Sequence, residues 1–234
     1  IMSEWKEKCE TEWNLQGAPL PDSVDWKSVY EKKPLGKNLL RNTAPFGNTS
    51  KDDPPPEPEL PDMPTRGPPQ FQPDGDFSGW TTSTEVLPYD MSGIPQGAVI
   101  CEMPRYSWFS MEQTVDLKAE GLWEELLDDF QPEIFIQDFY EESQLHDHIY
   151  ELHVKLLGAD KSTIIAEHNV SPVEDRTNYS HTWKMVSLVF CGYGPGVRYV
   201  HFKHQLKNSF MNEFFSTKFT DSAVVVKPSV NKKI

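Results

Sequence analysis

The segment 207–216, KNSFMNEFFS, gathers apolar side chains where a polar loop is expected. It contains Phe210, Met211, Phe214 and Phe215 and lies between two predicted strands. Loops between strands normally lie on the surface and are polar. One interpretation is a binding loop, because exposed apolar clusters usually mark interaction sites. The other is that the last two phenylalanines close the end of the fold and only Phe210 and Met211 are exposed.

A run of carboxylates is the second candidate for chemistry. It comprises Glu124, Glu125, Asp128 and Asp129. Paired carboxylates can act as a general acid and a general base. Nothing in the sequence distinguishes one of these residues from the others, so the run favours a solvated acidic face.

Histidines spaced for metal binding form the third candidate. His146 and His148 would share one face of a strand and could hold a metal ion. Their surroundings, ESQLHDHIY, favour an exposed turn, and no third ligand stands out, although His153 and His168 exist. No metal ion or other cofactor is therefore predicted.

The glycine-rich segment 192–198, GYGPGVR, resembles a phosphate-binding loop only in its glycine count. Pro195 stands where a backbone N–H would be needed, and no helix follows. No nucleophile motif is present either. The sequence predicts a protein that is not an enzyme.

Charge and cysteine content limit the partners and the compartment. The net charge is -14 and the pI about 4.9, which disfavours nucleic acid and anionic membranes. Cys9, Cys101 and Cys191 have no spacing typical of a disulfide framework or a zinc site, and this indicates free thiols. No signal peptide and no run of about 20 apolar residues is visible. A cytoplasmic protein without membrane insertion is predicted.

Proline divides the chain. Ten of the 20 prolines lie between Pro45 and Pro73, and such density predicts an extended segment without regular hydrogen bonding. Its P-x-x-P spacings are typical of SH3 or WW ligands, but a plain spacer is favoured. Four segments are predicted: an N-terminal segment, a first part of the main domain, a Pro-rich insert and the main domain, at residues 1–25, 26–41, 42–76 and 77–228.

Short alternating runs dominate the second half of the sequence. In YELHVKLL, every second residue is apolar, which is the period of a half-buried strand. Many such strands with turn residues between them predict an all-β fold, an antiparallel β-sandwich of the jelly-roll type. A helix is compatible with residues 4–14, and a helical turn or two with residues 118–129. The predicted strands are 80–86, 99–102, 108–117, 134–140, 150–157, 164–170, 183–190, 197–204 and 218–226.

Several longer motifs resemble one family. They are KNLLRN, GW at 79–80, VDLKAEGLWEELLDDFQPEI, YELHVKLL, YGPGVRYVHFKH and TDSAVVV, in this order. They are similar to the F-box-associated (FBA) domain over roughly residues 26–228. The resemblance implies a galactose-binding-like jelly roll without catalytic residues. It also implies the substrate-binding module of SCF ubiquitin-ligase adaptors, which act in glycoprotein quality control and ER-associated degradation.

The resemblance also implies a ligand site. In lectin-like members, a Tyr-Trp-Lys tip before the last strand binds high-mannose glycans, and its position here is occupied by Phe210, Met211 and Asn212. A phenylalanine from a second loop corresponds to Tyr106, two residues before Trp108. The replacement of Trp by Met211 and of Lys by Asn212 predicts weaker stacking and hydrogen bonding to such glycans. The expected ligand is a glycoprotein or another protein.

Ligase recruitment is expected only under one condition. Binding of Skp1 and a cullin requires an F-box, and the 25 residues before Trp26 are too few to hold this helical module. The alternative function that the resemblance implies is a cell-surface receptor of nonspecific cytotoxic cells with a Pro-rich signalling segment. Glycans on the sequons at Asn48, Asn169 and Asn178 would show that the chain has entered the secretory lumen and would favour the receptor interpretation.

Overall fold

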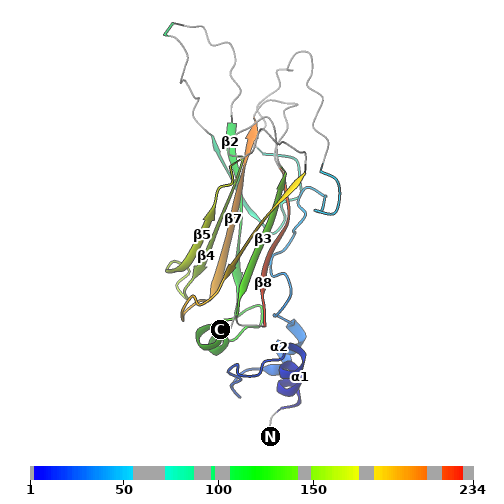
Figure 1. The fold of residues 1–234 in the computed structure, drawn as a ribbon, viewed down its shortest axis with the longest axis vertical. Coiled ribbons are helices and arrows are strands. Elements are labelled where there is room, and N and C mark those ends of the chain that lie inside the picture. Colours follow the sequence, from blue (N-terminus) through cyan, green and yellow to red (C-terminus); the bar gives the residue numbers. More distant parts are fainter. Residues whose placement is uncertain are drawn as a thin grey trace.

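The computed structural model describes residues 3–54, 72–86, 96–97, 106–141, 149–173, 182–209 and 218–228. Within these residues, two antiparallel sheets pack face to face (Figure 1). The larger sheet has the order β1-β2-β7-β4-β5. Its strands are β1 (Thr81–Val86), β2 (Tyr106–Asp116), β7 (Tyr199–Ser209), β4 (Tyr150–Leu157) and β5 (Ile164–Val170).

The smaller sheet has the order β6-β3-β8. Its strands are β6 (Trp183–Phe190), β3 (Ile134–Glu141) and β8 (Phe219–Val226). The inward positions of both sheets are apolar, as the alternation predicts, with Ile136, Val154 and Phe202 fully buried. The predicted all-β sandwich is confirmed.

The segment after α2 covers the free edge of β8. Asn38 forms a bridge with Val225, and its side chain accepts from the backbone N–H of Val224 and donates to the carbonyl of Ser222. Further along, the N–H of Asp221 donates to the carbonyl of Thr43. These bonds satisfy backbone groups that an open edge would leave unpaired.

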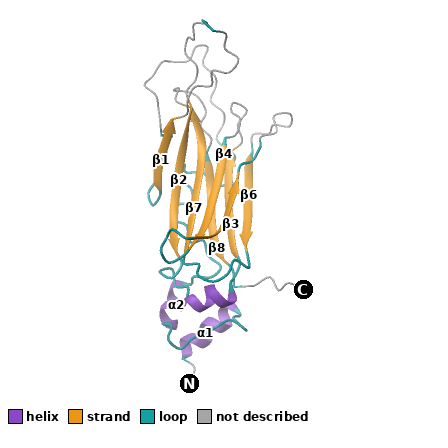
Figure 2. Cartoon of the chain, turned by 90° about the vertical axis from the view of Figure 1, so that its left-hand side faces the viewer, coloured by secondary structure: helices purple, strands orange, loops and turns teal. Residues whose placement is uncertain are grey.

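Two helices pack at one end of the sandwich (Figure 2). They are α1 (Glu4–Trp13), capped by Ser3, and α2 (Trp26–Lys32), capped by Asp25. The ring of Trp26 meets that of Trp123 with 4.9 Å between centroids, and both indoles donate to carbonyls of the α1–α2 connection. The helices are thereby fixed to the sandwich. No helix in the described part of the chain is both long and apolar enough to cross a bilayer.

The predicted strands end within two residues of the observed ones, except at the end of β7, and helix α2 was not predicted. β7 continues five residues beyond the predicted end, and β2 begins two residues earlier than predicted. The predicted helical turns around Trp123 become a turn followed by a short π-helix, η1 (Leu126–Phe130). The predicted strand 99–102 lies outside the described residues.

Candidate recognition site

The ladder between β2 and β7 brings together two segments that are about 100 residues apart in sequence. Tyr106, the first residue of β2, is the Cα partner of Ser209, the last residue of β7. Phe210 follows Ser209 directly, so both segments named for ligand binding leave adjacent strands at the same end of the sandwich, the upper end in Figure 1. The structure describes only the backbone of Tyr106. Phe210, Met211 and Asn212 lie outside the described residues.

Trp108 is the candidate residue whose side chain the structure places. Phe109 and Met111 are fully buried in the core, and Trp108 is half-buried on the opposite, outer face of the larger sheet. Its cross-strand neighbours are Glu85 on β1 and Lys207 on β7. A flat aromatic ring therefore lies between positions of opposite charge, two residues along the ladder from Ser209.

This combination suits a ligand with both apolar and polar groups. An indole face can pack against C–H groups, and its N–H and the neighbouring charged groups can form hydrogen bonds. Cross-strand neighbours on one face have Cβ atoms about 5 Å apart, so the three side chains at positions 85, 108 and 207 can contact one ligand. The arrangement offers binding groups but no paired acid and base.

A buried polar network joins the two sheets in the core. Asp138 on β3 accepts hydrogen bonds from Tyr150 Oη on β4, from His204 Nδ1 on β7 at 2.6 Å and from Ser222 Oγ on β8 at 2.7 Å. All four residues are at most 1% exposed. Burial, reinforced by the carboxylate of Asp138, raises the pKa of Tyr150 well above its usual value.

Aromatic rings enclose the histidine of this network. His204 is stacked between Phe219, at 3.5 Å between ring centroids, and Trp80, at 5.0 Å. Within the described residues, its Nε2 atom has no hydrogen-bond partner. Although aspartate, histidine and serine are the residue types of a hydrolytic triad, Ser222 here donates to Asp138 and not to the imidazole, and no solvent reaches the group. The network connects β3 and β8 to β4 and β7 and offers no route to a substrate.

The predicted solvated acidic face is wrong for Asp128. Its carboxylate accepts two hydrogen bonds from the guanidinium of Arg198, both at 2.8 Å, and one from the N–H of Gly196. These bonds lower the pKa of Asp128, with the Arg198 bond as the main cause. The φ of Gly196 is +103°, a conformation that favours glycine. The glycine-rich segment is therefore a tight turn, held in place by η1.

Two of the four histidines considered for metal binding contact other side chains, and the other two lie outside the described residues. His153 contacts Asn169 Oδ1 at 2.8 Å and Glu151 Oε2 at 3.0 Å, and the ring of His168 packs against Phe190. His146 and His148 fall outside the described residues. Where the structure is described, no cluster of side chains is suited to hold a metal ion.

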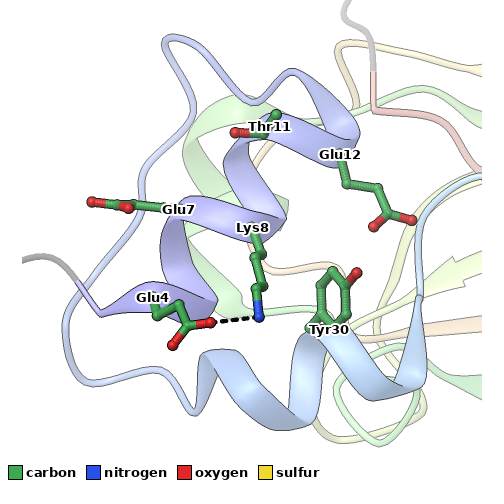
Figure 3. A pocket seen from close by; sticks show the side chains of 6 residues that line it. All are labelled: Glu4, Glu7, Lys8, Thr11, Glu12 and Tyr30. Carbon is green, nitrogen blue, oxygen red and sulfur yellow. Dashed lines mark ion pairs between the residues drawn. The ribbon is translucent and has the colours of Figure 1, made fainter.

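A hollow of about 530 Å³ lies between α1 and α2, at the end remote from Trp108 (Figure 3). Three of its four charged side chains form ion pairs: Lys8 bonds Glu4 at 2.7 Å, and Glu12 accepts from Lys33, whose ammonium lies 3.8 Å from the ring centroid of Tyr30. The hollow is an open surface groove, and no ligand is assigned to it.

The family model described as "F-box associated region" matches residues 30–226. The chain belongs to the FBA family. The match spans the sandwich from α2 to β8 and includes the strands that carry Tyr106, Trp108 and Ser209.

Relatives of this FBA chain include "F-box only protein 50" of Danio rerio, 61% identical over 98% of this chain and 98% of the relative. "F-box only protein 50" of Homo sapiens is 41% identical and covers 90% of this chain and 69% of its own length. "F-box only protein 2" of Bos taurus is 31% identical, with 96% of this chain and 70% of the relative covered. The predicted family resemblance is confirmed.

Proposed function

We propose that this FBA chain is a non-catalytic recognition module that selects a glycoprotein or another protein for ubiquitin-dependent degradation. The pairing of Tyr106 with Ser209, beside half-buried Trp108, carries the proposal. It supports one continuous binding surface at the ends of β2 and β7. Membership in a family named after the F-box supports the degradation pathway.

In this proposal, the ligand of the surface is not a high-mannose glycan. Met211 lacks the flat ring and Asn212 lacks the cation that the lectin-like tip would present. Loss of one aromatic anchor at an interface typically costs about 2 kcal/mol or more. We assign Trp108, Phe210 and Met211 to apolar contacts, and Asn212 to hydrogen bonding.

Partners and compartment follow from this role. A substrate selector acts with Skp1 and a cullin only through an F-box, which an upstream segment would have to supply. We place the protein in the cytoplasm, where ubiquitin ligases meet glycoproteins returned from the endoplasmic reticulum and where free thiols such as Cys191 remain reduced.

A glycan array tests the ligand class. The protein is compared with the variant Met211→Trp/Asn212→Lys. We expect no selective high-mannose signal from the natural sequence and a gain of signal from the variant. Selective binding of high-mannose or chitobiose glycans by the natural sequence would contradict the proposed change of ligand and would support lectin-like recognition.

Proximity labelling in cells, followed by direct binding of purified candidates, tests the protein-recognition role. Trp108→Ala should weaken binding of a confirmed partner about tenfold or more. Ile164→Ala, at an exposed apolar residue on β5, is the matched control and should leave affinity unchanged. Equal affinity of Trp108→Ala and the natural protein would place the binding surface elsewhere.

A further inference from the structure

The two sheets have four edge strands, and three of them carry features that discourage pairing with another chain. The edge of β8 is covered by the segment that contains Asn38. β5 exposes Glu167 and His168, and its register with β4 shifts near Leu156. β1 is short and consists mainly of Thr, Ser and Glu. Charge, bulges and covering segments are the usual protections of sheet edges.

β6 lacks these protections beyond its first residue in the described part of the chain; at Trp183, the indole N–H donates to the carbonyl of Asp52. Its sequence, WKMVSLVF, contains no proline and no acidic residue, and Lys184 near its start is the one charged residue. Its register with β3 is unbroken over eight residue pairs. Met185 is 60% exposed and Val189 is 40% exposed. An extended apolar edge of this kind is a template for pairing with another strand.

The apolar surface continues from this edge across the outer face of the smaller sheet. Val189 lies opposite Phe135, and Met185 lies opposite Phe139 on β3. Both phenylalanines are half-buried. A strand added beside β6 would therefore extend a surface that is already apolar.

We propose that β6 of a second copy of this chain pairs with β6 in antiparallel orientation. The two copies are related by a two-fold axis that passes between their Ser187 residues. A two-fold interface must be complementary to itself. In this register, Met185 lies opposite the partner's Val189, and Val186 lies opposite the partner's Leu188. Ser187 meets its own counterpart. The four central apolar positions, Met185, Val186, Leu188 and Val189, thus each face an apolar position on the same side of the sheet.

Charge also favours a second copy at this edge. With a net charge of -14, two copies repel one another across most of their surfaces. β6 is free of acidic residues, so this edge avoids that repulsion. In the proposed register, each Lys184 lies opposite the partner's Phe190, and the two lysines are at opposite ends of the junction.

The resulting assembly has one continuous six-stranded sheet in the order β8-β3-β6-β6-β3-β8. Because the two copies of β6 run antiparallel, the strand ends at Tyr106 and Ser209 of the two copies point in opposite directions. The two candidate recognition sites are therefore separate and equally accessible. This inference does not depend on the proposed function, because it concerns another edge of the molecule.

Sedimentation over a concentration series tests the assembly. The natural protein should show a reversible monomer–dimer equilibrium. In Met185→Lys/Val189→Lys, like charges lie directly opposite across the axis, and the dimer dissociation constant should rise about tenfold or more. Thr81→Lys/Thr114→Lys adds the same charge at exposed positions of the larger sheet and should leave the equilibrium unchanged. A protein that is monomeric at every concentration would overturn the proposal.

A charge pair tests the register. In Met185→Lys/Val189→Glu, each lysine lies opposite the partner's glutamate, although the two residues are four positions apart within one strand. This variant should dimerise more tightly than either single substitution. Dimerisation as weak as in the weaker single variant would overturn this register. Thermal unfolding of each variant confirms that the fold is intact.

A cysteine on the axis gives a direct readout. In a background of Cys101→Ser/Cys191→Ser, Ser187→Cys should form an intermolecular disulfide under mild oxidation, because it meets its own counterpart within disulfide reach. Thr114→Cys in the same background is the matched exposed control. Equal crosslinking of both, or a dimer in which only Thr114→Cys reacts, would contradict pairing through β6.

Discussion

The carboxylate of Asp138 receives three donors from strands of both sheets, and no part of it reaches solvent. A buried polar group is tolerated because its hydrogen bonds are made, and it becomes costly when one partner is removed. The residue therefore fixes how β3 and β8 sit on β4 and β7. It also fills an inward position that would otherwise be apolar.

Replacement of Asp138 by alanine should destabilise the protein strongly. The substitution leaves Tyr150, His204 and Ser222 without their acceptor, and disruption of a buried charged network costs about 3–5 kcal/mol. The free energy of unfolding from denaturant titration measures this loss. Asp129→Ala, at an exposed position, should stay within about 0.5 kcal/mol of the natural protein. Equal stability of the two variants would mean that the network is dispensable.

The raised pKa of Tyr150 predicts that the protein loses stability in alkaline solution. Its pKa is raised well above 10 in the folded state, so its contribution is fully present below the unfolded pKa of about 10. The contribution is lost as the pH rises from there towards the folded pKa, because only the unfolded chain releases the proton. Unfolding free energies between about pH 8 and 11 should fall less steeply for Tyr150→Phe. Parallel curves for both proteins would contradict this assignment.

At the scale of elements, η1 and the turn before β7 act as one unit. Asp128 contributes a carboxylate to the guanidinium of Arg198 and to the N–H of Gly196. Tyr193 Oη also donates to the carbonyl of Pro132, which lies between η1 and β3. The connection between β6 and β7 is thereby attached to the connection between β2 and β3.

This unit predicts a loss of stability in acid. Because the pKa of Asp128 is lowered in the folded state, its contribution is present above the unfolded pKa of about 4 and is lost as the pH falls through the folded value. Asp128→Asn should reduce stability at neutral pH and show a shallower loss below about pH 4. Asp129→Asn, the exposed neighbour, should follow the natural protein. An unchanged acid limb in Asp128→Asn would show that the pair does not stabilise the fold.

Alternation in the sequence was sufficient to predict most strands. β4, β5 and β6 begin and end at the predicted residues because each is bounded by turn residues and keeps its apolar period. The extension of β7 to Ser209 could not be predicted, because Asn208 and Ser209 have low strand propensity and are held there by pairing with β2. Long-range pairing of this kind is absent from any local pattern.

The candidate site was predictable in part. The sequence indicates Tyr106, Trp108 and the tip at 210–212 as candidates. Only the pairing of β2 with β7 shows that the two segments leave adjacent strands. The buried network was missed, yet a signal existed. His204 follows Val200 and Phe202 at inward positions of one strand, and a polar residue at such a position requires a buried partner. The identity of that partner, Asp138, depends on how the sheets stack.

At the scale of the whole molecule, the sequons separate the two candidate functions. Asn169 is exposed, and its amide oxygen contacts His153. If the protein acts beside the ubiquitin ligases, protein isolated from its own cells should carry no glycan at Asn48, Asn169 or Asn178, since N-glycosylation requires the secretory lumen. Mass spectrometry with and without glycosidase treatment measures this. Occupied sequons would support the receptor alternative.

The segment after α2 that covers the edge of β8 has a consequence for how the protein is made. Asn38 holds the N–H of Val224, 186 residues further along the chain. During synthesis, a ribosome delivers the N-terminal residues first, at about 5–20 residues per second, so this segment waits many seconds for the strand that it covers. The smaller sheet cannot close until β8 has emerged. Nascent chains of this protein therefore expose the apolar faces of β3 and β6 until β8 has been made and completes the smaller sheet.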